Sequence, residues 1–212
     1  MSLSRQEDFL TKGRQNQKMR TREALLDAAM ELARHGHSPS IAEVAEAARV
    51  SVATAYRYFP NPQSLWSDMA TRTGGPGYLD FLNHLPEDPE AAIDVVVREI
   101  AQLQLADEAL WRGVLRATLD RWFNQADLPE EERVPVRGIA RLEMARKALA
   151  PLRDTLAPKA FERLTNAVVL VFGLEPMITT RDTCGLSPEA ATELMRWAAQ
   201  ALVRAALADA ED

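Results

Sequence analysis

The stretch that decides the fold is SIAEVAEAARVSVATAYRYFPNP, residues 40–62. It holds two short segments with apolar residues at helical spacing, separated by the three-residue break ARV. Ser40 followed by Glu43 is the capping-box pattern, which predicts that a helix begins there. Ser51 is the next candidate N-cap, and Pro60 ends the second helix because proline cannot continue it. The stretch predicts two helices joined by a three-residue turn, which is the helix-turn-helix geometry.

The second of these helices carries polar residues where a packed helix would carry leucine. Val52, Ala55 and Phe59 share one stripe, which we expect to face the core. The opposite side presents Ala53, Thr54, Tyr56, Arg57 and Tyr58. Small residues allow close approach to base edges, Thr54 can contact thymine or phosphate, and Arg57 can bind guanine or phosphate. This pattern favours a helix that enters the major groove of DNA.

The distribution of charge agrees with this interpretation better than the net charge of −6 does. Residues 1–70 hold 9 Lys/Arg and 8 Asp/Glu, whereas residues 71–212 hold 16 and 23. The positive charge is concentrated in Lys12, Arg14, Lys18, Arg20 and Arg22. The segment is therefore a basic arm on an acidic body. Either it contacts nucleic acid or it is a solvated N-terminal segment.

The rest of the chain is predicted to be helical, because the alternation of apolar and polar residues that is typical of strands is absent. A first helix, residues 21–36, ends at Gly36. Residues 62–73 form a connecting helix capped by Asn61, and TGGPG, residues 73–77, breaks the chain. Further helices are expected over residues 78–84, 89–105, 107–124, 130–154, 158–181 and 187–209. We expect an all-α protein with an N-terminal three-helix domain, residues 1–61, and a larger helical domain, residues 62–212.

Other classes of protein find little support in the sequence. Cys184 is the one cysteine, so an intrachain disulfide is excluded. No run of 18 apolar residues and no signal-peptide pattern occurs, which predicts a cytoplasmic protein without a membrane partner. His35 and His37 could hold a metal, but no third ligand is near them in the sequence. Because GxGxxG, P-loop and GxSxG motifs are absent, we predict no enzyme, no cofactor and no metal site.

The segment IAEVAEAARVSVATAYRYFPNPQSL resembles the DNA-binding segment of the TetR family of bacterial transcriptional regulators. The matching pieces are TREALLDAAMELARHG, the serine-capped SIAEVAEAA, VS at the start of the third helix, and TAYRYFPN with a later leucine. Together they cover residues 18–66. The resemblance implies an all-helical homodimer whose N-terminal domain binds a palindromic operator on double-stranded DNA, usually to repress. It also implies a C-terminal domain that binds a small-molecule effector and forms the dimer interface.

The resemblance assigns DNA-facing positions residue by residue. They are Ser40, Ser51, Val52, Ala53, Thr54, Tyr56, Arg57 and Tyr58, with Lys18, Arg20 and Arg49 as further candidate phosphate contacts. The chain departs from the family pattern twice. Arg49 stands where many members have glycine, and a positive φ there would cost about 1 kcal/mol. Pro62 stands where many members have a lysine that reaches the DNA backbone.

The C-terminal half offers weaker signals. Residues 167–174 are apolar nearly all round, and Leu194 and Trp197 belong to an apolar stripe of the last helix. These last two helices form either a four-helix dimer interface, as the resemblance implies, or simply the core of one chain. Glu175 pairs with Arg181, pairs with an arginine across a dimer, or lies in a pocket.

Candidate effector-binding residues are the large side chains of the middle helices, although core packing is the alternative for each. They are Trp66, Met69, Trp111, Leu115, Trp122, Met144 and Phe172. Their character suggests a mostly apolar effector, and the GGPG loop is a candidate hinge. The resulting hypothesis is a ligand-responsive repressor that the effector releases from DNA. The alternative is a helical protein-interaction or ligand-sequestering module without DNA binding.

Overall fold

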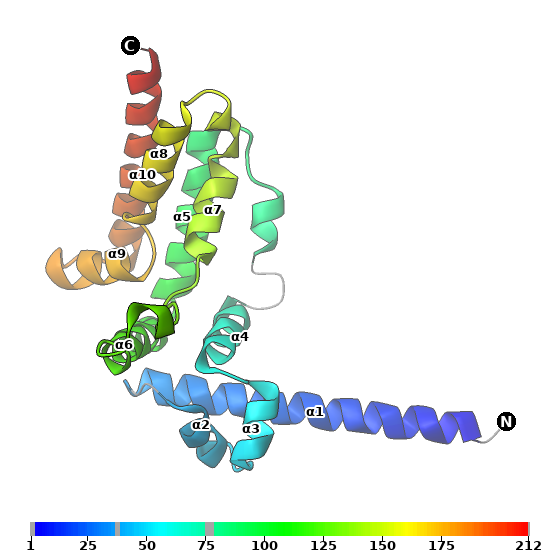
Figure 1. The fold of residues 1–212 in the computed structure, drawn as a ribbon. Coiled ribbons are helices and arrows are strands. Elements are labelled where there is room, and N and C mark those ends of the chain that lie inside the picture. Colours follow the sequence, from blue (N-terminus) through cyan, green and yellow to red (C-terminus); the bar gives the residue numbers. More distant parts are fainter. Residues whose placement is uncertain (1–2, 37–38, 75–78, 212) are drawn as a thin grey trace.

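The computed structural model describes the backbone of residues 3–36, 39–74 and 79–211. Every regular element in these three ranges is a helix, and none of them contains a strand. The predicted all-α class is therefore confirmed. Figure 1 shows two groups of helices, one around the C-terminal half of the first helix and one around the last helix.

The first group is formed by four helices in sequence order. They are α1 (Leu3–Arg34), α2 (Ile41–Ala47), α3 (Val52–Tyr58) and α4 (Pro62–Gly74). Their shared apolar core consists mainly of Leu25, Leu26, Ala29, Ile41, Val44, Ala45, Ala55, Phe59, Leu65 and Met69. Leu110 from the later helix α6 completes this core, so that the first group is closed by a residue from the C-terminal half of the chain.

Helix α1 is longer than the predicted helix, residues 21–36. It has 32 residues, which corresponds to a length of about 48 Å at the usual rise per residue. Among the side chains that the structure describes, Leu25 is the first buried one, and those of residues 16–20 are exposed. Figure 1 shows this N-terminal part projecting beyond α3 and α4.

The second group contains the remaining elements. They are η1 (Asp80–Asn83), α5 (Pro89–Leu105), α6 (Glu108–Asn124), η2 (Glu130–Glu132), α7 (Ala140–Ala148), η3 (Ala150–Arg153), α8 (Pro158–Val169), α9 (Leu174–Ile178), the π-helical turn η4 (Thr179–Thr183) and α10 (Pro188–Glu211). Helix α5 contacts both α7 and α10, and α8 contacts α7 and α10. Their buried side chains, such as Val96, Leu149, Val168, Phe172 and Met195, form the second apolar core.

Two of the predicted helices are wrong. Residues 130–154 do not form one helix, because Pro135 and Gly138 interrupt the segment and α7 begins only at Ala140. Residues 158–181 are broken at Gly173, whose φ of 105° lies in the left-handed region. A Cβ atom at Gly173 would lie 2.3 Å from Nη1 of Arg141, so the break also makes room for that guanidinium.

The two groups meet where α6 crosses the end of α1. A Cβ atom at Gly113 would lie 2.3 Å from the carbonyl oxygen of Ala33, so the helices approach at backbone distance. Arg34 Nε donates to Asp107 Oδ2 at 2.8 Å. The other oxygen of Asp107 accepts from the backbone N–H of Leu110 at 3.2 Å and caps α6. One carboxylate therefore begins α6 and holds it to α1.

The predicted boundary after residue 61 stays a prediction. The predicted GGPG hinge falls mostly on residues 75–78, which lie outside the described residues, and α4 ends at Gly74. Within the described parts of the chain, none of the helices combines the length and the apolar character needed to cross a bilayer.

Candidate DNA-binding surface

Helix α2 begins with the predicted capping box. The Ser40 hydroxyl oxygen accepts from the backbone N–H of Glu43 at 3.2 Å, and the Ser40 N–H donates to Glu43 Oε2 at 2.7 Å. Two N–H groups that would otherwise lack a partner at the helix start are therefore satisfied. Ile41, Val44 and Ala45 are then buried against α1, which fixes the orientation of α2.

The turn between α2 and α3 depends on Arg49. Its φ is 56°, so it occupies the left-handed region that favours glycine. The strain is about 1 kcal/mol for a residue with a Cβ atom. The Val50 N–H donates to the Ala45 carbonyl at 2.9 Å and closes the turn. The Arg49 side chain is exposed beside the start of α3.

Helix α3 begins at the predicted cap Ser51. Its hydroxyl oxygen accepts from the Thr54 backbone N–H at 3.2 Å and lies 2.8 Å from the Thr54 hydroxyl. Ala55 and Phe59 are buried in the first core, as the stripe predicted. The prediction that Val52 also faces inward is wrong, because its side chain is 45% exposed. The helix begins at Val52, and its buried contact starts one turn later, at Ala55.

The exposed side of α3 forms one continuous surface, which we name the reading face. It consists of Ser51, Val52, Ala53, Thr54, Tyr56 and Arg57. Tyr56 is 49% exposed. The Arg57 guanidinium lies 5.8 Å from the centre of the Tyr58 ring, and Tyr58 is half-buried against the first core. This contact steadies Arg57 without removing its donors from solvent.

The segment that contains the turn and α3 has a net positive charge. No acidic residue occurs between Glu46 and Asp68, whereas Arg49 and Arg57 both lie in that segment. A segment that carries cationic and hydroxyl donors and no acidic residue of its own suits the phosphate groups of a nucleic acid.

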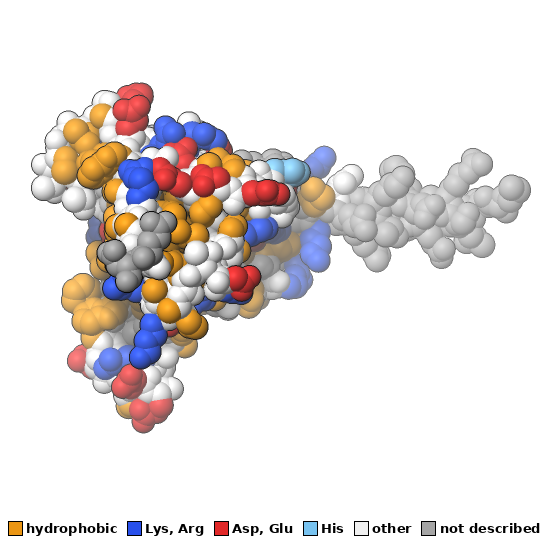
Figure 2. All heavy atoms as spheres, turned by 90° about the horizontal axis from the view of Figure 1, so that it is seen from above, with side chains coloured by type: hydrophobic (Ala, Val, Ile, Leu, Met, Phe, Trp, Pro, Cys, Tyr) orange, Lys and Arg blue, Asp and Glu red, His pale blue; other side chains and the backbone are white. Residues whose placement is uncertain are grey.

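Helix α1 adds cations beside the reading face. Lys18 and Arg20 are exposed. Arg22 forms an ion pair with Asp68 of α4, and its guanidinium lies 5.9 Å from the centre of the Phe59 ring. Figure 2 shows Lys and Arg side chains around the part of α1 that leaves the body of the molecule.

The predicted effector-binding residues are distributed over both cores and α6. Trp66 is half-buried and Met69 buried in the first core, whereas Met144 and Phe172 are buried in the second. The remaining three residues, Trp111, Leu115 and Trp122, follow α6 from its buried start to its exposed end. A groove of about 540 Å³ between α5 and α10 is lined by other residues, among them Arg98 and Arg196. Pocket lining by the seven residues therefore stays a prediction.

Several networks of ion pairs connect the C-terminal helices, and no pattern in the sequence predicted which residues pair. Glu175 forms ion pairs with Arg137 and Arg141 at 2.5 and 3.0 Å. Arg181, its expected partner, instead binds Glu108 of α6 at 2.8 Å. The neighbouring Asp182 accepts from Arg112, and this hydrogen bond lowers the pKa of the Asp182 carboxyl.

No group of three or more His, Cys, Asp or Glu side chains that could hold a metal ion occurs among the described residues. His35 hydrogen-bonds to the Glu31 carbonyl at the end of α1. His37, the other member of the predicted pair, lies outside the described residues.

The comparison with known protein families agrees with this geometry. Residues 25–67 match the family model described as bacterial regulatory proteins, tetR family. The matched segment begins in α1, contains all of α2 and α3, and ends in α4. It thus coincides with the capping box, the strained turn and the reading face. No protein with a curated description matches the chain.

Proposed function

From the premise that the chain is a DNA-binding transcriptional regulator of the tetR family, we propose that it is a ligand-responsive repressor. It binds a palindromic operator as a homodimer in the cytoplasm, and a small, mostly apolar effector releases it. The observation that carries this proposal is the reading face, which combines exposed donors with small side chains on a helix that is fixed from behind by Ala55 and Phe59.

Roles on the DNA follow from the chemistry of each side chain. Arg57 has the planar donors that can bind O6 and N7 of guanine together. Tyr56 and Arg49 suit phosphate oxygens, because their donors are exposed at the two edges of α3. Val52 and Ala53 are small enough to let the start of α3 approach base edges.

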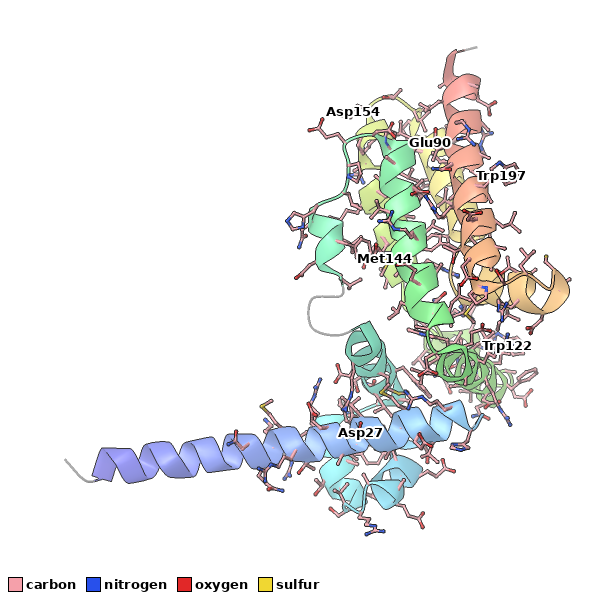
Figure 3. All side chains as sticks on the ribbon, turned by 180° about the vertical axis from the view of Figure 1, so that it is seen from behind. Asp27, Glu90, Trp122, Met144, Asp154 and Trp197 are labelled. Carbon is pink, nitrogen blue, oxygen red and sulfur yellow. The ribbon has the colours of Figure 1, made fainter. Side chains whose placement is uncertain are left out.

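The dimer is supported by a second uncovered surface, which we name the dimer face. It consists of Leu170 at the end of α8 and Leu194 and Trp197 on α10, and these side chains are 76%, 38% and 62% exposed. Figure 3 shows Trp197 on the outer side of α10. Large apolar side chains are unfavourable in water, and tryptophan is a frequent anchor of protein interfaces. Two copies of α8 and α10 would cover each other as a four-helix bundle.

The proposed effector site lies near the junction of α5 and α6. Gln104 is only 6% exposed, and within the described residues its Oε1 has no hydrogen-bond partner. A buried acceptor without a partner is unfavourable by about 1–3 kcal/mol. Trp111 packs nearby, since its Nε1 donates to the Leu103 carbonyl at 3.2 Å. A mostly apolar effector with one donor group would satisfy the Gln104 oxygen.

The experiment that tests the proposal is a binding titration with DNA fragments from around the gene, at low and high salt. The wild type is expected to bind one fragment far more tightly than the others, and as a dimer. The variant Y56A/R57A is expected to lose that preference while its circular dichroism stays unchanged. Equal binding of all fragments by the wild type, or none, would leave the interaction-module alternative as the better account.

A reporter gene placed behind the selected fragment tests the direction of regulation. Expression is expected to rise when the protein is absent. A fall in expression would identify an activator and contradict the repressor part of the proposal.

A further inference from the structure

Helix α6 carries apolar side chains on two opposite sides. Leu110 and Ala117 on its inner side are buried. The outer side carries a second apolar row, which we name the outer stripe and which consists of Leu115, Leu119, Trp122 and Phe123. These residues recur three or four positions apart from Leu115 to Leu119 and from there to the two aromatic residues, so they share one face of the helix. Leu119, Trp122 and Phe123 are 51%, 53% and 68% exposed.

The loop that follows α6 is bound to a different side of the helix. Gln125 exchanges two hydrogen bonds with the backbone of Val134, at 2.8 and 3.0 Å. Arg121 Nη1 donates to the Val136 carbonyl at 3.0 Å. Positions 121 and 125 are four residues apart and follow Ala117 at the same spacing, so they continue the inner side. The loop is therefore held at the inner side, and the outer stripe is left exposed.

The outer stripe and the dimer face lie on the same side of the molecule. Figure 3 shows Trp122 and Trp197 on the side away from the N-terminus of α1. The elements that connect them are in contact with one another, because α9 contacts α6 and η4, and η4 contacts α10. Arg112 of α6 also donates two hydrogen bonds of 2.7 Å to Asp182 of η4. An interface that begins at the dimer face can therefore continue along η4 and α9 to the outer stripe.

The dimer face alone is small for a stable dimer. Its three large apolar side chains are only partly exposed, and at the usual size of such side chains they offer roughly 300–400 Å². A stable interface buries about 800 Å² on each partner. The exposed side chains of the outer stripe offer a similar area to those of the dimer face. Together the two surfaces approach the size that a stable dimer needs.

The side chains around the outer stripe suit a second copy of the chain. Arg116 and Asp120 flank the stripe, and their charges balance, since Arg116 Nε lies 3.9 Å from Asp120 Oδ2. A two-fold dimer brings the same surface of both copies together, so flanking charges of one sign would repel each other. The rings of Trp122 and Phe123 pack edge to face with their centres 5.1 Å apart. Aromatic groups of this kind are frequent anchors of protein interfaces.

The inner side of α6 connects the outer stripe to the DNA-binding part of the chain. Gly113 approaches the carbonyl oxygen of Ala33, and Arg34 donates to Asp107 at 2.8 Å. Leu110 belongs to the core that also holds α3. A contact that fixes α6 against a second copy therefore also limits how far apart the two reading faces can lie.

We propose that the outer stripe of α6 is buried against a second copy of the chain and that this contact fixes the separation of the two reading faces. This inference rests on the proposed function, because it extends the proposed dimer from α8 and α10 to α6. The interface is then continuous from the dimer face to the helix that crosses α1.

The first test measures self-association by sedimentation equilibrium. Phe123→Glu and Leu119→Glu are each expected to weaken the dimer at least tenfold, because the change introduces a carboxylate at both copies of the stripe. Val134→Glu is the matched control, since Val134 is 62% exposed in the loop held at the inner side, and it should leave the dimer constant unchanged. Circular dichroism and thermal unfolding of the variant monomers should match those of the wild type.

The second test uses the unchanged protein, so it does not depend on the folding of a variant. Hydroxyl-radical labelling followed by mass spectrometry is carried out below and above the concentration at which the wild type dimerises. Labelling of Trp122 and Phe123 is expected to fall at least threefold in the dimer. Labelling of Val134 should stay the same.

The third test addresses the separation of the reading faces. The selected operator is compared with one that carries an additional base pair between its half-sites. The wild type is expected to bind the longer operator at least tenfold more weakly. Phe123→Glu, at concentrations where it is dimeric, is expected to discriminate between the two operators less than threefold.

Three results would overturn the inference while leaving the proposed function intact. Phe123→Glu and Leu119→Glu could form dimers as stable as those of the wild type. The outer stripe could be labelled equally in monomer and dimer, which would leave it free for a different protein. Phe123→Glu could also discriminate between the two operators as strongly as the wild type does. A wild type that stays monomeric, or that selects no DNA, would count against the proposed function itself.

Discussion

The reading face and the dimer face are both uncovered in a single chain, yet they differ in chemistry. The reading face offers the cation of Arg57, hydroxyl groups and small side chains on a seven-residue helix. The dimer face offers Leu170 and Trp197 on longer helices. Exposure alone therefore does not identify a partner. Cationic and hydroxyl donors select a polyanion, whereas exposed aromatic and aliphatic groups select a protein surface of the same kind.

The largest expected effect comes from charging the dimer face. Trp197→Glu should weaken self-association by more than about 2 kcal/mol, because an anchor is lost and a carboxylate is desolvated in its place. Sedimentation velocity would show a monomer at concentrations where the wild type is a dimer. Val134→Glu, which charges an equally exposed apolar residue in the loop before α7, should leave the dimer intact. If the Trp197→Glu protein remained a dimer, the dimer face would not be the interface between two copies, and its proposed difference from the reading face would be contradicted.

Next in size is the effect of Arg57→Ala on the reading face. If Arg57 binds guanine, its loss should cost about 1–3 kcal/mol at one base pair of each half-site. Titrations with operators that carry single-base changes would show that the variant no longer discriminates at that position. Uniform weakening on every operator would instead identify a phosphate contact.

Substitutions of Ser51 distinguish its contribution to the stability of α3 from its contact with DNA. Ser51→Ala removes the cap and should lower the free energy of unfolding by about 1 kcal/mol. Ser51→Asp keeps a capping oxygen and should restore stability, but it places a negative charge against phosphate. Denaturant unfolding and DNA titration on the same two variants would show stability and binding changing independently. Parallel changes in both quantities would contradict the assignment.

The smallest effect is expected at Arg49. Arg49→Gly relieves the positive φ and should stabilise the fold by up to about 1 kcal/mol, less the entropy that glycine loses on folding. The same change removes a cation and should make DNA binding slightly weaker and less dependent on salt. Thermal unfolding measures the change in stability, and a salt titration of DNA binding measures the change in affinity and in its salt dependence. Tighter DNA binding would show that Arg49 makes no phosphate contact.

The sequence predicted those helix ends that depend on a local cap or stop, because a cap is a property of adjacent residues. Ser40 with Glu43, Gly36 and Asn61 all stand where helices begin or end. Predictions failed where a distant neighbour decides the outcome. The apolar stripe placed Val52 inside, but its side chain is 45% exposed, and the buried contact of α3 starts at Ala55. The break at Gly173 serves the Arg141 side chain, which is 32 residues earlier in the chain.

Long-range polar pairs were beyond the reach of the sequence for the same reason. Asp94 of α5 accepts two hydrogen bonds from Arg196 of α10 at 2.7 and 2.8 Å, and a third from Gln200 at 3.1 Å. Asp94 is nearly buried, so it depends on these partners. A single sequence records that these residues are polar, but not which two helix surfaces meet.

The backbone contact between Gly113 and Ala33 bears on how the two halves of the chain can move. When two helices slide past each other, side chains at their contact can change rotamer. A contact between two backbones cannot adjust in this way, because neither partner has a side chain to move. The crossing of α1 and α6 is therefore expected to stay rigid when the two halves of the chain move. Any shift that an effector imposes on α6 should carry the end of α1 with it, so that the two recognition helices of a dimer change their separation and not their internal shape.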